Sequence, residues 1–202
     1  MSRKITLDPR RTGHRKPAKR IVIIVEGRSE KIYFERFRTP ESSIAIRIHE
    51  SKDHAAKGIM NKCLSLIERS GLDTDVDEVM AVFDADRNTV EDIEDAMKIC
   101  SENNIKMYIS NPSFEFWLLL HFEEDKTTYI QEDLEKRLEK HIKTEYKKSE
   151  GINRYIGHEN IELAIVRSKS LLVDGDPIKC KNTVPSTCLH ILVEKITKKT
   201  KQ

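Results

Sequence analysis

Acidic residues follow two apolar runs of the sequence, at points where buried strands are expected to end. Glu26 comes directly after residues 21–25, and Asp84 and Asp86 come at the end of residues 79–83. Residues two apart lie on the same face of an extended segment. Carboxylates gathered without a basic partner repel one another unless a divalent cation neutralises them, and their oxygens suit Mg²⁺ or Mn²⁺. The pattern predicts a metal site of Glu26, Asp84 and Asp86, with Glu26 either holding the metal or acting as a general base.

These acids also have a structural interpretation, because acidic residues after strands are common as turn formers and helix caps. A DxD pattern alone does not decide between the two interpretations. The metal site is favoured because a Glu-Gly pair and a DxD pair follow two strands of one predicted sheet. Ligands of such sheets bind outside the carboxyl ends of the strands. Gly27 would also let a phosphate approach the backbone closely.

Further charged residues flank the predicted metal site. Glu30 lies about one helical turn after Glu26. It therefore either points into the same crevice as a catalytic group or serves as a first-turn acid that the helix dipole favours. Arg28, Lys31 and Arg87 are candidates for neutralising a phosphate oxygen.

Residues 113–122 are too apolar to face water and predict a buried helix, in which Glu115 is the one acid. An unpaired buried carboxylate costs several kcal/mol, so Glu115 should have a partner or a metal, and it is a catalytic candidate. Asn111 is predicted to cap this helix and to donate to a phosphate. His121 is expected about 120° away from Glu115 around the helix, on a different face.

The elements that must position these residues alternate between strands and helices. Continuous or alternating apolar runs predict four strands, at residues 21–25, 44–48, 79–83 and 105–109. Apolar residues at helical spacing predict helices between them, at residues 30–38, 59–67 and 90–100. Ser29 is the predicted cap of the first helix and Gly71 the predicted end of the second. The alternation predicts an α/β fold, a mostly parallel sheet with helices on both faces.

The rest of the chain is predicted to be helical. Apolar residues recur at helical spacing within three further segments, residues 130–142, 161–172 and 189–196, with a loop over 173–186. We therefore divide the chain into a basic flexible arm (1–20), an α/β domain (21–122) and a helical C-terminal region (123–202) that packs on the domain.

Basic residues are concentrated at the two ends of the chain. Residues 1–20 carry a net charge of +7 and the last eight residues +4, whereas the whole chain carries +2, so the body between them is acidic. The arm contains Arg10, Arg11, Arg15 and Lys16, and its prolines should keep it extended. It is interpreted as a contact for nucleic acid. The alternative is that the basic ends only keep the chain in solution.

Several classes of protein are excluded by missing motifs. No apolar run approaches the roughly 18 residues of a membrane span, and the basic N-terminus lacks the apolar core of a secretory signal. Neither GxxxxGK[ST] nor GxGxxG after a strand is present, which excludes the common phosphate-binding loops. The four cysteines form no CxxC pair. These features predict a cytoplasmic protein with reduced thiols and no membrane contact.

Three segments resemble the RloB-like family and, more distantly, the Toprim catalytic domain of topoisomerases, primases and OLD-type nucleases. They are residues 24–34 (IVEGRSEKIYF), 82–87 (VFDADR) and 110–122 (SNPSFEFWLLLHF), with a weaker fourth at 182–187 (NTVPST). The resemblance implies a Toprim-like fold and a Mg²⁺-dependent nuclease of bacterial phage defence or abortive infection. It also implies a larger ATPase as a partner.

Two functions from different classes follow from the sequence. The first is a Mg²⁺-dependent phosphodiesterase that acts on DNA or RNA. The second is a non-catalytic module that binds nucleic acid or an ATPase partner, in which the acids serve as caps. Neither the kind of nucleic acid nor the oligomeric state follows from the sequence.

Overall fold

The computed structural model describes most of the chain, namely residues 19–39, 44–124, 126–127, 130–171 and 173–200. The four basic residues singled out in the arm lie outside the described residues, and they are Arg10, Arg11, Arg15 and Lys16.

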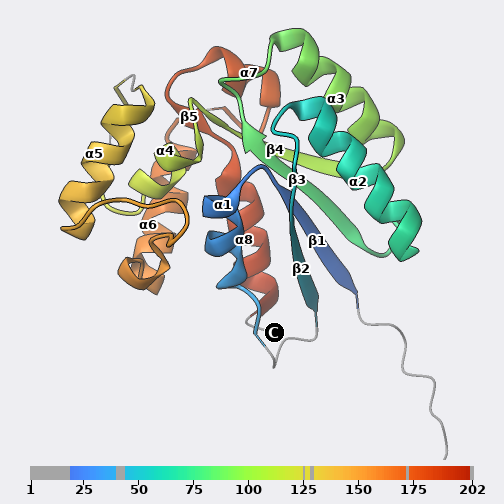
Figure 1. The fold of residues 1–202 in the computed structure, drawn as a ribbon, viewed down its shortest axis with the longest axis horizontal. Helices are drawn as coiled ribbons and strands as arrows, with labels where there is room; N and C mark the ends of the chain where they lie inside the picture. Colours follow the sequence, from blue (N-terminus) through green and yellow to red (C-terminus); the bar gives the residue numbers. More distant parts are fainter. Residues whose placement is uncertain (1–18, 40–43, 125, 128–129, 172, 201–202) are drawn as a thin grey trace, which may run out of the picture.

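A five-stranded, mostly parallel sheet forms the centre of the described structure (Figure 1). Its strands, in order across the sheet, are β2 (Ala45–Glu50), β1 (Arg20–Val25), β3 (Glu78–Asp84), β4 (Ile105–Asn111) and β5 (Ser186–Thr187). The first four are parallel, and β5 is antiparallel to β4. β1 and β3 are buried along nearly their whole lengths, as continuous β-branched and apolar runs predict for strands covered on both faces.

Helices cover both faces of this sheet, which confirms the predicted α/β fold. α1 (Arg28–Glu35) and α8 (Leu189–Thr200) lie on one face, and α2 (Ala56–Ser70) and α3 (Val90–Glu102) lie on the other (Figure 1). α2 ends at Gly71, as predicted, and this residue has a φ of 53°, in the left-handed region that glycine adopts without steric cost.

The order of the strands reverses at the pair β1 and β3. β1 has β2 on one side and β3 on the other, and α1 and α2 cover opposite faces (Figure 1). The loops that leave the carboxyl ends of β1 and β3 therefore part from each other and leave a crevice. Glu26 follows β1 and Asp84 ends β3, so both acids lie at this crevice.

The C-terminal region completes the sheet. The predicted loop over 173–186 contains a helix, α7 (Pro177–Asn182), and leads directly into β5. Asp176 caps α7 by accepting hydrogen bonds from the N–H groups of Ile178 and Lys179. Elements of six and two residues are too short to show apolar periodicity, which is why the sequence predicted only a loop.

The remaining helices pack around the same core as the sheet. α4 (Phe114–Leu119) is buried along its whole length and is shorter than the predicted helix over 113–122. It is followed by α5 (Gln131–Ile142), the 3₁₀ helix η1 (Asn153–Tyr155) and α6 (His158–Lys169). One hydrophobic core includes residues of the sheet and of the C-terminal region alike. Every helix in the described part of the chain is too short or too polar to cross a membrane.

Asn111, at the end of β4, is buried and holds α7 against the sheet. The two N–H bonds of its Nδ2 group are shared among the backbone carbonyls of Cys180, Lys181 and Thr183, at 3.1, 2.7 and 3.2 Å. The prediction that Asn111 caps the following helix is wrong, because the N-cap of α4 is Ser113. The amide of Asn111 is used instead to join two distant parts of the chain.

We predict that Asn111→Ala lowers the free energy of unfolding by about 2–4 kcal/mol, because carbonyls at the end of α7 lose a donor that joins them to the sheet. Urea denaturation measures the change. Asn103→Ala is the matched control, since Asn103 Nδ2 donates to the single carbonyl of Ile99 at the end of α3, and it should cost about 1 kcal/mol or less. An Asn111→Ala protein as stable as the wild type would contradict the structural role.

Candidate active site

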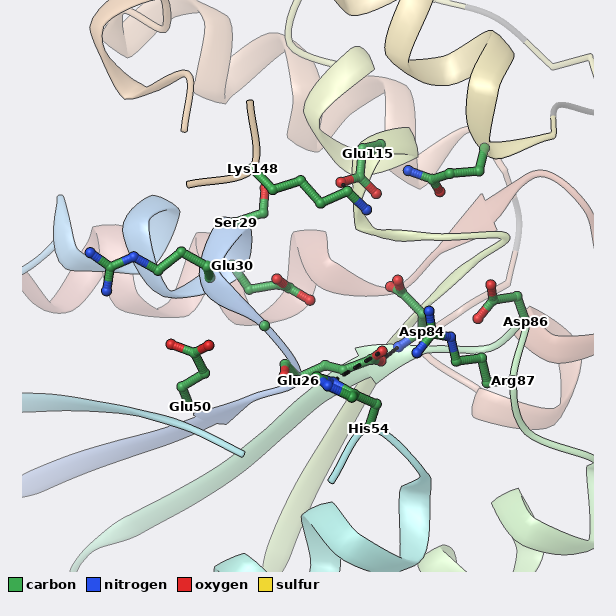
Figure 2. Close-up of a pocket in the computed structure, with 13 residues that line it drawn as sticks. Glu26, Ser29, Glu30, Glu50, His54, Asp84, Asp86, Arg87, Glu115 and Lys148 are labelled. Carbon is green, nitrogen blue, oxygen red and sulfur yellow. Dashed lines mark hydrogen bonds and ion pairs between the residues drawn. The ribbon is translucent and has the colours of Figure 1, made fainter. Parts of the chain in front are cut away.

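A cavity of about 330 Å³ opens at the carboxyl ends of β1 and β3 (Figure 2). Residues from several separate segments line it, namely Glu26, Gly27, Arg28, Ser29, Glu30, Glu50, His54, Asp84, Asp86, Arg87, Glu115, Gln131 and Lys148. Figure 2 shows Glu26 and Asp84 at the edge of the sheet and Glu115 and Lys148 on the facing side of the cavity. We refer to this cavity as the carboxylate pocket.

Glu26 is fixed in the pocket by the neighbouring strand. Its Oε2 accepts a hydrogen bond of 2.9 Å from the backbone N–H of Asp84. Its Oε1 lies 3.9 Å from Nδ1 of His54, and the same Nδ1 lies 3.1 Å from the Glu26 carbonyl oxygen. Burial raises the pKa of Glu26, although the Asp84 N–H and the Arg87 charge oppose the increase. The carboxylate is therefore held at the crevice in one orientation.

Glu30 lies in the pocket as well as in the first turn of α1. The helix begins at Arg28 with Gly27 as its N-cap, so the prediction that Ser29 caps it is wrong. A Cβ atom on residue 27 would lie only 3.3 Å from Glu30 Oε2. Burial, reinforced by the charges of Glu115 and Glu26, raises the pKa of Glu30 to about 8.

Asp84 and Asp86 both line the pocket, from the end of β3 and the turn after it. Burial raises the pKa of Asp84 well above its usual range, and the charges of Glu30 and Glu26 raise it further. Asp86 and its neighbour Arg87 are exposed. The DxD pair therefore presents to the pocket one carboxylate with a raised pKa, Asp84, and one solvated carboxylate, Asp86.

Two residues outside the pocket fix the turn that carries the DxD pair. Asn88 Nδ2 donates to the Asp84 carbonyl at 2.8 Å, while its Oδ1 accepts from the N–H of Ala56 at 2.8 Å. Lys181, from α7, donates to the Ala85 carbonyl at 2.7 Å. The backbone of the DxD turn is thus held from both the α2 side and the C-terminal region.

Glu115, the acid in α4, is 2% exposed, and its partners include Tyr146 and Lys148. Tyr146 Oη donates to Glu115 Oε1 at 3.1 Å, and Lys148 Nζ lies 3.1 Å from the same oxygen. Because the single hydroxyl proton of Tyr146 goes to the carboxylate, Ser29 Oγ donates to Tyr146 Oη, at 2.6 Å. Burial by itself would raise the pKa of Glu115, but the Lys148 charge and the side-chain hydrogen bonds to the carboxylate together outweigh it and leave this pKa below its ordinary value.

The sequence-predicted residues do not all meet in this pocket. Glu26, Arg28, Glu30, Asp84, Asp86, Arg87 and Glu115 line it. Lys31 and Asn111 are not among its lining residues. His121 is buried away from it, with Nδ1 next to the Trp117 carbonyl and Nε2 next to the Tyr33 hydroxyl. The expectation that His121 and Glu115 face different ways agrees with these positions.

Sequence reasoning missed several lining residues, namely Glu50, His54, Gln131 and Lys148. Tyr146, which contacts Glu115, was missed as well. Lys148 lies in a charged stretch that has no apolar period and no motif. Glu50 did carry a sequence signal, because it closely follows the predicted strand at residues 44–48 and ends β2. No such signal marks His54, Gln131, Tyr146 or Lys148, which reach the site through long-range packing.

The pocket suits a hard divalent cation by the chemistry of its donors. Six carboxylates line it against three Lys or Arg side chains, and two of the acids have strongly raised pKa values through burial and mutual repulsion. Within the described ranges, however, no three His, Cys, Asp or Glu side chains are gathered closely enough to enclose a metal ion. Mg²⁺ usually binds through one or two protein carboxylates and keeps several waters. An open arrangement of this kind is therefore compatible with Mg²⁺.

Comparison with known proteins adds one match. The sequence model of a protein family described as RloB-like protein matches residues 21–196, from β1 into α8. No curated protein and no solved structure matches the chain.

We predict that Glu30→Gln removes part of the pH dependence of stability. A carboxyl group whose pKa is higher in the folded protein than in the unfolded chain keeps its proton longer when folded. Its contribution to the free energy of unfolding is therefore full below about pH 4.5 and is lost as the pH rises towards about 8. Without divalent cations, the variant should be more stable than the wild type by about 4 kcal/mol at pH 8, and this difference should vanish near pH 4.

Urea denaturation across this pH range, in the presence of a chelator, measures the difference. Glu35→Gln is the matched control, because Glu35 lies on the same helix and pairs with Arg38 on the surface. Parallel stability profiles for Glu30→Gln and the wild type would show that folding does not raise the pKa of Glu30.

Proposed function

The chain belongs to the RloB-like family, and from that premise we propose that its carboxylate pocket hydrolyses phosphodiester bonds of nucleic acid with a bound divalent cation, Mg²⁺ or Mn²⁺. The observation that carries the proposal is the hydrogen bond between Glu26 and the Asp84 backbone. It places acids from two strand ends at the point where the strand order reverses, which is where ligands of such sheets bind.

Asp84 and Asp86 would hold the cation, with Glu26 beside them. When bound, such an ion stabilises the charge that develops on phosphate oxygens and lowers the pKa of water. Arg87 and Arg28 line the same pocket and would pair with non-bridging oxygens of the substrate.

Glu26 and Glu30 would handle the proton of the attacking water. Oε2 of Glu26 is committed to the Asp84 N–H, which leaves Oε1 to accept a proton. Glu30 has a pKa of about 8, raised mainly by its burial, and a general base works best when its pKa lies near the operating pH. Glu26 would thus be the fixed proton acceptor, and Glu30 would be the neighbouring carboxyl group that holds a proton.

The biological setting is also part of the proposal. The resemblance in residues 24–34, 82–87 and 110–122 supports a role in bacterial phage defence, with an ATPase as a partner. Both DNA and RNA present the phosphodiester that this pocket would accept. The basic arm would add sequence-independent contacts to the phosphate backbone.

We predict that the double variant Asp84→Asn/Asp86→Asn loses Mg²⁺ and Mn²⁺ binding in calorimetric titrations and loses hydrolysis of DNA and RNA by at least about 100-fold. Thermal unfolding should show a fold at least as stable as the wild type, because repulsion between the acids is reduced. The matched control is Glu91→Gln/Glu94→Gln, which removes two exposed acids of α3 and should bind metal normally.

The titrations also separate the two classes of function. Metal binding without hydrolysis in the wild type would indicate that a partner is required. Hydrolysis retained in the double variant would overturn the proposed site. A wild type that binds no divalent cation at millimolar concentration would favour a non-catalytic nucleic-acid-binding module.

We predict that replacing Arg10, Arg11, Arg15 and Lys16 with alanine weakens nucleic-acid binding and makes it less sensitive to salt. Removing each side chain that neutralises a phosphate should reduce the slope of log K against log salt by about 0.7–0.9. Fluorescence anisotropy at several salt concentrations measures the slope. An unchanged slope would show that the arm does not bind the phosphate backbone.

A further inference from the structure

Residues 143–152, between α5 and η1, form a segment that crosses to the carboxylate pocket. We call it the crossing segment. Tyr146 anchors it, because the Tyr146 N–H donates to Glu139 Oε1 at 3.0 Å and the hydroxyl joins Ser29 to Glu115. The side chain of Tyr146 is buried, so the segment is held on the protein rather than projecting into solvent.

The other end of the crossing segment is seated on α1. Gly151 has a φ of 64°, and a Cβ atom there would lie 2.5 Å from Cγ2 of Ile32. Only glycine meets both the left-handed backbone and this close approach. Asn153 Nδ2, just beyond, donates to the Ile32 carbonyl. The segment is therefore fixed at both ends, and Lys148 lies between the two anchors.

Lys148 places an ammonium group at the pocket without burying it. Its Nζ lies 3.1 Å from Glu115 Oε1 and 3.7 Å from Glu135 Oε1, while 53% of its side chain is exposed. Burial by itself would lower the pKa of Lys148, but Glu115, Glu135 and Asp84 outweigh it and raise this pKa. The Lys148 ammonium is thus fully charged and interacts electrostatically with acids on both sides of the pocket (Figure 2).

We propose that Lys148, which is ion-paired with Glu115 at the pocket, binds the phosphate group of the substrate. The inference rests on the proposed function and deepens it. Glu115 is already paired with Lys148 and accepts a hydrogen bond from Tyr146, so it does not need a metal. An anionic phosphate entering beside Asp84 meets an ammonium that is half exposed and can turn towards it.

The proposal requires opposite effects on two ligands. A positive charge at the pocket opposes the binding of a divalent cation and favours the binding of phosphate. Loss of Lys148 should therefore tighten Mg²⁺ binding and weaken phosphate binding. A purely structural role would not produce this pair of effects, because a loosened pocket would bind both ligands less well.

The experiment compares Lys148→Met with Lys147→Met, which makes the same change one residue earlier. Lys147 is exposed to a similar extent and pairs with Glu145 and Glu150 on the surface. Calorimetry measures Mg²⁺ binding to each protein and then inorganic phosphate binding to the Mg²⁺-saturated protein. For Lys148→Met we expect Mg²⁺ to bind about three- to tenfold more tightly and phosphate about tenfold more weakly. Lys147→Met should match the wild type, and Lys148→Arg should retain phosphate binding.

The outcomes distinguish this inference from the proposed function. Equal behaviour of Lys148→Met and Lys147→Met would overturn the role of Lys148 while leaving the metal site intact. Weaker binding of both ligands by Lys148→Met would also overturn it, in favour of a structural role. A wild type that binds no divalent cation would overturn the proposed function and this inference with it.

Discussion

The 2.9 Å hydrogen bond from the Asp84 N–H to Glu26 Oε2 joins the two strand ends on which the pocket is built. Without it, Glu26 would be free to turn away from Asp84, as like charges do when water can reach them. The bond depends on the parallel pairing of β1 with β3, which sets Val25 beside Val82. The buried, branched side chains of these strands therefore fix the register and, through it, the distance between the acids.

Holding several acids together has an energetic cost, and other parts of the chain offset it. Raised pKa values at Glu30 and Asp84, caused by burial and by neighbouring acids, show where this cost falls. The DxD turn cannot relax away, because Asn88 and Lys181 bind its carbonyls. Across the cavity, Glu115 is stabilised as a carboxylate by the hydrogen bond from Tyr146 and the ion pair with Lys148. The acids on the sheet side of the pocket therefore repel one another, whereas the acid on α4 is paired with a lysine.

The sequence predicted the parts of the molecule that depend on local pattern. Continuous apolar runs located β1 and β3, and the position of Glu26 and the DxD pair after these runs placed the acids at one edge of the sheet. Lys148 and Tyr146 could not be predicted, because Tyr146 is 31 residues from Glu115 along the chain and lies in a segment without periodicity. Asn111 was given the wrong role for a similar reason, since its acceptors are about 70 residues away.

The dependence of the DxD turn on Lys181 has a consequence for the order in which the chain is made. Glu26, Asp84 and Asp86 leave the ribosome well before α7 and β5, so a nascent chain carries its acids before it carries the groups that hold them. The last strand of the described sheet, Ser186–Thr187, also comes more than 90 residues after the DxD pair. The DxD turn therefore has its complete set of backbone contacts only after residues 177–187 have been made. Under the proposed function, this timing keeps incomplete copies from presenting an assembled site to the messenger and ribosomal RNA beside them.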